Sequence, residues 1–382
     1  MRNESIYARD IGPITNGLRG VISRAEVILK SRSLMDESNK PFISIGITTY
    51  NRKELLKRCL ASILNQTNGD FEVLIGNDYQ KEELSADVLG IHDTRVNYIN
   101  HKNNIGERQN LNYLLQCASG RYFSWQFDDD YYGQEYVNRI YGLTSQYPNL
   151  NCVFTSFKKV FDDKFEMPKF SKKSEGELLD GKTFLQRYWR HDIRAMGFTG
   201  TYRTSYLRSI GGAPALTSSP YALYSEYLLL FQTAKESFVG YIDEPLVFYY
   251  VHEGSWGNAN SELERYEEAG VNLFEKSLEV FRSASLIEDI RRNTRNLSKM
   301  VFHDYAKKSS MQPGLKCLRD MKRFFNRNLA AYLSDGMTTF LNRLKLSLLR
   351  WAWSVTPITK TKLKKVANQD ILINLLKIYE RF

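Results

Sequence analysis

Short runs of β-branched and aromatic residues alternate with helical patterns through the first third of the chain, and this alternation constrains the fold more than any other feature. The runs lie at residues 42–47, 71–75, 96–99 and 122–127, and each is typical of a strand. Apolar residues at helical spacing follow the first run and precede the last. Strands that alternate with helices in this way favour a parallel sheet. We therefore predict an α/β fold with a doubly wound, mostly parallel sheet and helices on both faces.

The later part of the chain continues this pattern less regularly. Helices are predicted to about residue 146, at 181–189 and at 222–234, a strand at 152–157, and a glycine-rich connector at 196–202. Residues 239–251 are predicted to form two short strands that break at Pro245. Near the beginning, Asn51 is predicted to cap the helix that follows the first strand, with Glu54 three residues later.

Basic residues are concentrated in the last quarter of the chain. Residues 291–382 hold 20 Lys and Arg against 5 Asp and Glu, whereas the rest of the chain holds 33 against 38. Such a tail is typical of proteins that meet nucleic acid or an anionic membrane surface, attached to a body with a separate role. We divide the chain into an N-terminal arm (1–40), an α/β domain (41–260) and a helical basic C-terminal region (261–382).

The composition is that of a globular protein. Its 42% apolar and 25% charged residues exclude collagen-like and wholly disordered chains. No apolar run approaches the roughly 18 residues of a membrane-spanning helix, and the beginning of the sequence lacks the pattern of a secretory signal. We expect a cytoplasmic protein.

Three aspartates, Asp128, Asp129 and Asp130, follow the fourth predicted strand directly. Two carboxylates about 4 Å apart repel by roughly 4 kcal/mol at an effective dielectric of 20, so a cluster of this kind needs a positive partner. A hard divalent cation, Mg²⁺ or Mn²⁺, is the natural one. On a strand, Asp128 and Asp130 would project to one side and Asp129 to the other, which makes the outer two the metal pair. The alternative is a solvated acidic loop.

Five motifs in order resemble the family-two glycosyltransferases. They are Thr48-Thr49-Tyr50-Asn51-Arg52 after the first strand, Asn65-Gln66-Thr67 at the end of the first helix, Asp78 after the second strand, Asn104-Ile105-Gly106, and the aspartate triplet. The likeness covers about residues 41–252. It implies a GT-A fold, with a nucleotide-binding half at 41–135 and an acceptor half at 136–260, and a nucleotide-diphosphate sugar as donor.

The resemblance also implies which residues bind the nucleotide. Thr48 and Tyr50 would hold the nucleobase, and Asp78 would accept the N3–H of uracil, an acceptor role that fits uracil and not cytosine. Asp128 would lie near the ribose, and Arg108 is the candidate for the phosphates. One departure is Asn77, which stands where the family usually has a further acid.

Metal binding and catalysis are implied in the same way. Asp130 and Asp128 match the family's D-x-D pair, and His252 matches a late histidine that binds metal or diphosphate; imidazole suits Mn²⁺ better than Mg²⁺. Glu226 is the candidate base that removes the proton of the acceptor hydroxyl. The chain departs from the family at Tyr131 and Ser225, where further acids are usual.

The basic tail predicts a surface role. Residues 339–353 form a basic amphipathic pattern, and residues 360–365 add four lysines, so the tail could lie on an anionic membrane and bring the enzyme to lipid-linked acceptors. The alternative is a helical cap that packs on the catalytic domain or on a second copy of the chain. No nucleic-acid reader motif is present, and we expect no nucleic-acid partner.

Together these features predict a cytoplasmic, membrane-peripheral, metal-dependent hexosyltransferase. It would move a sugar from a UDP-sugar to a hydroxyl of a glycan or lipid-linked glycan, with inversion, in polysaccharide or glycoconjugate biosynthesis. Two alternatives stay open. One is a nucleotidyltransferase on a related sheet, and the other is a scaffold protein with a degenerate site.

Overall fold

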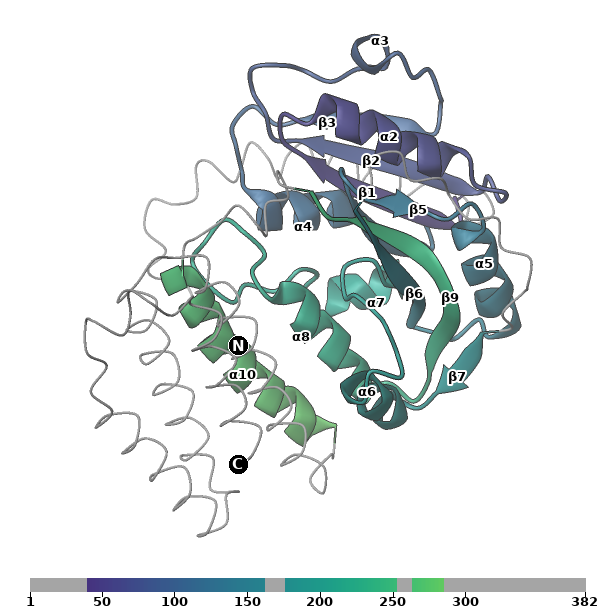
Figure 1. The fold of residues 1–382 in the computed structure, drawn as a ribbon, viewed down its shortest axis with the longest axis vertical. Helices are drawn as coiled ribbons and strands as arrows, with labels where there is room; N and C mark the ends of the chain where they lie inside the picture. Colours follow the sequence, from purple (N-terminus) through teal and green to yellow (C-terminus); the bar gives the residue numbers. More distant parts are fainter. Residues whose placement is uncertain (1–39, 162–175, 253–262, 285–382) are drawn as a thin grey trace, which may run out of the picture.

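A nine-stranded sheet is the centre of the part of the chain that the computed structural model describes, residues 40–161, 176–252 and 263–284 (Figure 1). The strand order is β3-β2-β1-β4-β8-β6-β9-β5, and β7 pairs with β9. The predicted N-terminal arm and the basic segments at 339–353 and 360–365 lie outside the described residues.

The first half of the sheet is parallel. It contains β1 (Ile43–Thr49), β2 (Phe71–Asn77), β3 (Val96–Asn100) and β4 (Tyr122–Phe127). Strand β1 lies between β2 and β4 and pairs with both in parallel register. The carboxyl ends of β1, β2 and β4 therefore meet at one edge of the sheet, which is where ligands bind in folds of this type.

The second half of the sheet is mixed. Short β8 (Thr201–Arg203) joins β4 to β6 (Cys152–Val160) in antiparallel pairs, and β9 (Val239–Tyr250) runs parallel to β6. Two further short strands, β5 (Tyr131–Tyr132) and β7 (Glu177–Leu179), pair antiparallel with β9. The long pairings are parallel and the antiparallel ones are short, so the predicted α/β fold with a mostly parallel sheet is confirmed. The connector predicted at 196–202 contains the start of β8, which sequence reasoning missed.

Strand β9 corrects the prediction of two strands broken at Pro245. The strand is continuous over twelve residues, and its register against β6 shifts on either side of the Ser156–Pro245 pair. Proline cannot donate to a ladder and is tolerated at bulges. The irregularity therefore accommodates Pro245 without ending the strand.

Helices cover both faces of the sheet, each turning an apolar stripe inward. On one face, α2 (Lys53–Leu64) and α5 (Tyr136–Gln146) pack on the odd-numbered residues of β1 and β2. The other face is covered by α4 (Glu107–Cys117), α6 (Gly181–Trp189), α7 (Thr204–Ser209) and α8 (Ser225–Gln232). Buried Trp125 ties this second layer to the sheet, because its indole N–H donates to the carbonyl of Leu111 at 2.9 Å. Two short helices, α3 (Ala86–Leu89) and η2 (Thr233–Lys235), complete the domain.

A long helix, α10 (Leu263–Ser283), packs against α8 (Figure 1). Asn272 and Lys276 on this helix donate to the carbonyls of Leu216 and Ala215 in the loop before α8. The helix thus fastens that loop through two side-chain hydrogen bonds. Among the described residues, no helix has both the length and the apolar content that crossing a bilayer requires.

Candidate active site

Asp128, Asp129 and Asp130, here called the acidic turn, follow β4 at the carboxyl edge of the parallel strands. The strand ends at Phe127, and Asp128 and Asp129 form a turn. The prediction that the outer two aspartates share one side of a strand is therefore wrong in its geometry. A turn rotates successive side chains away from strict alternation, so the three carboxylates have different sets of partners although Asp128 and Asp129 share Arg52.

Asp128 is held by the end of β1. Its Oδ2 accepts a 2.7 Å hydrogen bond from the Thr49 hydroxyl, and its Oδ1 lies 3.2 Å from Arg52 Nη1. Burial raises the pKa of the Asp128 carboxyl to about 7, and the charge of Asp129 adds to the rise, whereas Arg52 and Thr49 oppose it. At neutral pH this carboxyl is poised between its charged and neutral forms.

Asp129 joins the acidic turn to two basic side chains. Its Oδ2 lies 3.0 Å from Arg52 Nη1 and 3.1 Å from His252 Nε2. The His252 ring is stacked on Tyr250, with 4.9 Å between ring centroids. Arg52 therefore bridges two aspartates, and the predicted metal ligand His252 contacts the middle aspartate.

Asp130 is the most buried member of the acidic turn. Its Oδ1 accepts the backbone N–H of Tyr250 at 2.9 Å. Its Oδ2 is buried and has no hydrogen-bond partner within the described residues. Burial, followed by the charge of Asp129, raises the pKa of the Asp130 carboxyl well above its ordinary value, and Asp128 and Glu226 add to the rise.

A divalent cation fits the donor chemistry of this turn. An orphaned carboxylate oxygen on Asp130, with a second carboxylate and an imidazole beside it, is a set that hard cations accept. Within the described ranges, no three His, Cys, Asp or Glu side chains are grouped closely enough to enclose a metal. The fit is therefore to an ion that takes one or two carboxylates from the protein and the rest of its shell from water and phosphate oxygens.

Asp78 supports the loop before α4. Its two carboxylate oxygens accept the backbone N–H groups of Ile105 and Gly106, each at 2.8 Å. Gly106 has φ +82°, and a Cβ there would lie 2.5 Å from Pro220 Cβ, so the position favours glycine. These contacts account for two motifs of the sequence, Asp78 and Asn104-Ile105-Gly106, as parts of one junction. Further lone pairs on the carboxylate can still accept a ligand N–H.

Gln66 gives the second motif a structural explanation. Its amide donates to the carbonyl of Gly133 at 2.8 Å and accepts the N–H of Val137 at 3.0 Å. The end of α2 is thereby fastened to the chain that leaves the acidic turn.

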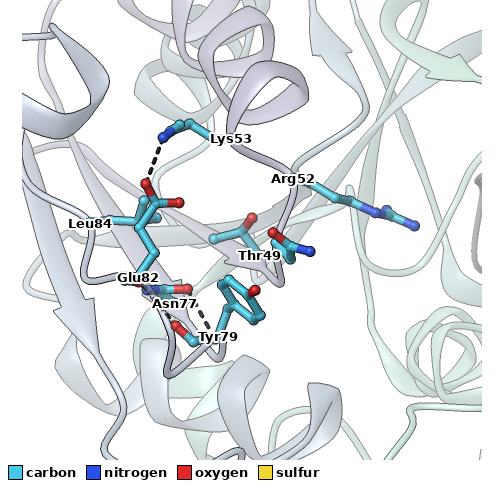
Figure 2. Close-up of a pocket in the computed structure, with 8 residues that line it drawn as sticks. Thr49, Arg52, Lys53, Asn77, Tyr79, Glu82 and Leu84 are labelled. Atoms are coloured by element: carbon cyan, nitrogen blue, oxygen red, sulfur yellow. Dashed lines mark hydrogen bonds and ion pairs between the residues drawn. The ribbon is translucent and has the colours of Figure 1, made fainter.

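A shallow pocket opens between the ends of β1 and β2 (Figure 2). It is lined by Thr49, Asn51, Arg52, Lys53, Asn77, Tyr79, Glu82 and Leu84. The Arg52 side chain points away from the pocket, and Lys53 pairs with Glu82 at its rim at 2.6 Å. Of the predicted base-binding residues, Tyr50 is 51% exposed and meets the ring of Tyr79 edge-on, whereas Thr48 does not line this pocket.

Asn51 and Asn77 have conformational roles at the same edge. Helix α2 begins at Lys53 with Arg52 at the N-cap, and Asn51 has φ +53°. The predicted capping by Asn51 is therefore wrong; asparagine suits the position because it tolerates the left-handed region. The Asn77 amide donates to the carbonyl of Glu82 at 2.8 Å and to the Asn100 side chain at 2.9 Å. It organises the loop that forms one wall of the pocket.

Arg108 and Glu107 begin α4 on the side of the acidic turn. The backbone N–H of Arg108 donates to the Pro220 carbonyl at 3.0 Å, and its Nε is buried without a partner among the described residues. Glu107 accepts the N–H of Ala222 at 2.9 Å. Burial raises the pKa of the Glu107 carboxyl, the Ala222 hydrogen bond opposes the rise, and the charges of Asp129 and Arg52 act on it in opposite directions.

Glu226 lies in the first turn of α8. Its charge makes a small contribution to the raised pKa of the Asp130 carboxyl, after burial and the charges of Asp129 and Asp128. The N-cap residue Tyr224, two positions before Glu226, has φ +57°. Gly197 approaches so closely that a Cβ there would lie 1.9 Å from the Glu226 carbonyl oxygen. The structure thus brings Glu226 into the electrostatic neighbourhood of the acidic turn, although about 100 residues separate them.

Sequence reasoning missed three contributors to this site: Thr49, Arg52 and Glu107. Thr49 could have been found from the pairing of neighbouring strands. It is the last residue of β1, and Asp128 is the residue that directly follows the adjacent strand β4. Arg52 is the last residue of the motif after the first strand, and the electrostatic need for a cation near the acidic turn is the signal that could have identified it. Glu107 carried no signal, since its role depends on the distant Ala222.

Comparison with known proteins shows which proteins the site region is similar to. The model of glycosyl transferase family 2 matches residues 44–211. An uncharacterized glycosyltransferase of Rickettsia bellii is 30% identical over 30% of this chain and 16% of its own length, and one of Rickettsia typhi is 27% identical over 59% and 70%. The first three curated relatives are matched over only 16 to 32% of their lengths.

One solved structure supports the fold. Staphylococcus aureus TarS has a TM-score of 0.50 and 14% identity, over 76% of this chain and 49% of that chain. The acidic turn, the Asp78 junction and the loop after β1 all fall within residues 44–211. Through this segment the chain is similar to glycosyl transferase family 2, and its fold is of the GT-A type.

Proposed function

We propose that this chain transfers a hexosyl group from a UDP-sugar to a hydroxyl of a glycan or lipid-linked glycan, with inversion, in polysaccharide or glycoconjugate biosynthesis. The observation that carries the proposal is the buried Asp130 Oδ2 at the carboxyl edge of the parallel strands, which has no hydrogen-bond partner among the described residues. This reaction requires one acidic group that holds the metal ion at the diphosphate and a second that accepts the proton of the acceptor hydroxyl.

Donor binding falls to the first half of the sheet. We assign the uracil to the edge formed by β1 and β2, where Tyr50 and Tyr79 offer aromatic faces and Asp78 offers acceptor lone pairs for the N3–H. Asp128 would contact the ribose, and Arg108 would supply positive charge near the phosphates. Thr48 stays a prediction, because the pocket is lined by its neighbour Thr49.

Asp130, Asp128 and His252 would hold Mn²⁺ or Mg²⁺. When bound, such an ion neutralises the charge that develops on the departing diphosphate. The residues themselves perform separate tasks: Thr49 orients Asp128, Tyr250 fixes Asp130 through its backbone N–H, and Asp129 holds His252 in place.

Glu226 acts as the base in a single displacement. As the acceptor oxygen forms its bond to the anomeric carbon, the bond from that carbon to the phosphate oxygen breaks, and the acceptor proton passes to the Glu226 carboxylate. Attack from the face opposite the leaving group inverts the anomeric centre. In this proposal Asp130 serves the leaving group, whereas Glu226 serves the acceptor.

The test is UDP release measured with a panel of UDP-sugars, glycan acceptors and Mn²⁺. We expect turnover in the wild type, loss of turnover with retained UDP binding in Glu226→Gln, and loss of both turnover and metal-dependent UDP binding in Asp130→Asn. Arg95→Gln is the control, because it removes a charge from the partly exposed ion pair with Asp93, which is not part of the proposed site. Properly folded protein that releases no UDP with any donor would contradict the proposal.

The same assay separates the alternatives. A nucleotidyltransferase would break a phosphate bond and release pyrophosphate, and the loop after β1 lacks the glycine that such phosphate loops need. A scaffold protein would bind UDP without turnover. Docking of residues 339–365 on anionic membranes stays a prediction for liposome binding at low salt.

A further inference from the structure

Arg52 divides the acidic turn unequally. Its Nη1 lies 3.2 Å from Asp128 and 3.0 Å from Asp129, so one guanidinium serves two carboxylates. Asp130 receives only the N–H of Tyr250 among the described residues, and its Oδ2 has no partner there. A cation supplied by the chain thus already occupies part of the space in which a divalent ion would act.

We propose that Arg52 is the internal counter-cation of the acidic turn and makes metal binding depend on the donor. The inference rests on the proposed use of a metal and a nucleotide diphosphate. Without donor, Arg52 repels an incoming dication and competes with it for Asp128 and Asp129. With donor, the diphosphate brings negative charge that offsets both cations, so metal and donor bind better together than either does alone.

The position of Arg52 suits this role. Its backbone is fixed at the N-cap of α2, next to buried β1, while its side chain keeps 26% of its surface exposed. The side chain begins at the edge of the pocket and points away from it (Figure 2). Its Nη1 contacts Asp128 and Asp129 of the acidic turn. A guanidinium so placed can exchange a carboxylate for a phosphate oxygen without movement of the sheet.

The size of the effect follows from charge alone. Even with the dielectric of water, a guanidinium and a dication about 6 Å apart repel enough to weaken metal binding about tenfold. Loss of the two Arg52 hydrogen bonds to carboxylates acts in the same direction, because it frees oxygens for the metal. A neutral residue at position 52 should therefore strengthen metal binding in the absence of donor, which is opposite to the usual result of damaging a site.

The experiment is calorimetric titration of Mn²⁺ into the full chain, with and without UDP. We expect Arg52→Gln and Arg52→Met to bind Mn²⁺ without UDP about tenfold or more tightly than the wild type. The ratio of Mn²⁺ affinities with and without UDP should fall in both variants. Arg52→Lys keeps the charge and Arg95→Gln removes one from the Asp93 pair, and both should resemble the wild type.

Two results would overturn the inference, and they have different meanings. If the wild type binds Mn²⁺ but both neutral variants, with unchanged circular dichroism, bind it equally or less tightly, the role of Arg52 is wrong and the proposed function stands. If the wild type binds no Mn²⁺ with or without UDP, the metal-dependent function fails and this inference fails with it. Two neutral variants are used so that misfolding of one leaves the test intact.

Discussion

Replacement of Thr49 by valine tests the connection between β1 and the acidic turn. The two side chains have nearly the same shape, but valine lacks the hydroxyl that donates to Asp128 at 2.7 Å. Both partners are buried, with Thr49 5% and Asp128 4% exposed, so water cannot replace the lost donor. A hydrogen bond to a charged group contributes about 1.5–3 kcal/mol, and we expect a loss of about 2 kcal/mol of stability where Asp128 is ionised.

The assay is thermal unfolding followed by circular dichroism at pH 8, above the pKa of about 7 of Asp128. For a domain of this size, about 2 kcal/mol lowers Tm by roughly 4–8 °C. Thr49→Ser keeps the hydroxyl and is the control, with a much smaller shift expected. If Thr49→Val melts with the wild type at pH 8, the hydrogen bond does not contribute as argued, and Thr49 loses its place in the site.

Three further predictions concern the surroundings of the site. Glu107→Gln keeps an acceptor for the N–H of Ala222. Because the pKa of Glu107 is raised in the folded state, the wild type loses stability as the pH rises through that pKa, and the variant does not. The Tm of the variant should therefore rise relative to that of the wild type between pH 5 and pH 8. A difference that stays constant with pH would count against the buried charge. Gly197→Ala should displace the first turn of α8 and lower the rate of transfer more than the affinity for UDP. Gly142→Ala is the control and should leave both unchanged, because a Cβ there meets nothing within 4 Å. Equal kinetics in the two variants would refute this. Arg139→Gln should cost about 3–5 kcal/mol in urea unfolding, because it leaves Glu244 buried and unpaired, and the double variant with Glu244→Gln should recover part of that loss.

The parallel half of the sheet was predictable because its signals are local. The runs at 42–47 and 122–127 coincide closely with β1 and β4, and the helix predicted at 181–189 has the bounds of α6. Continuous burial on both faces makes such strands apolar throughout. Strands β5, β7 and β8 have two or three residues each and take their stability from pairing, so no periodicity announces them.

The site was predictable in its location but not in its contacts. Three aspartates after a buried strand required positive charge, and the sequence alone favoured an external metal. The structure shows that Arg52 already meets part of that requirement. Which carboxylate a guanidinium reaches depends on turn geometry, and Asn51 at φ +53° sets the direction in which the chain enters α2. Neither feature leaves a pattern in spacing or composition.

The hydrogen bond from the Tyr250 N–H to Asp130 joins positions 120 residues apart. During synthesis on the ribosome, β1 to β4 can assemble while β9 is still untranslated, since domains form as their segments emerge. The nascent acidic turn would then carry its charges without Tyr250 or His252 beside it. A stalled chain that ends before β9 would therefore expose an unfinished acidic turn, and chaperones have reason to retain such an intermediate.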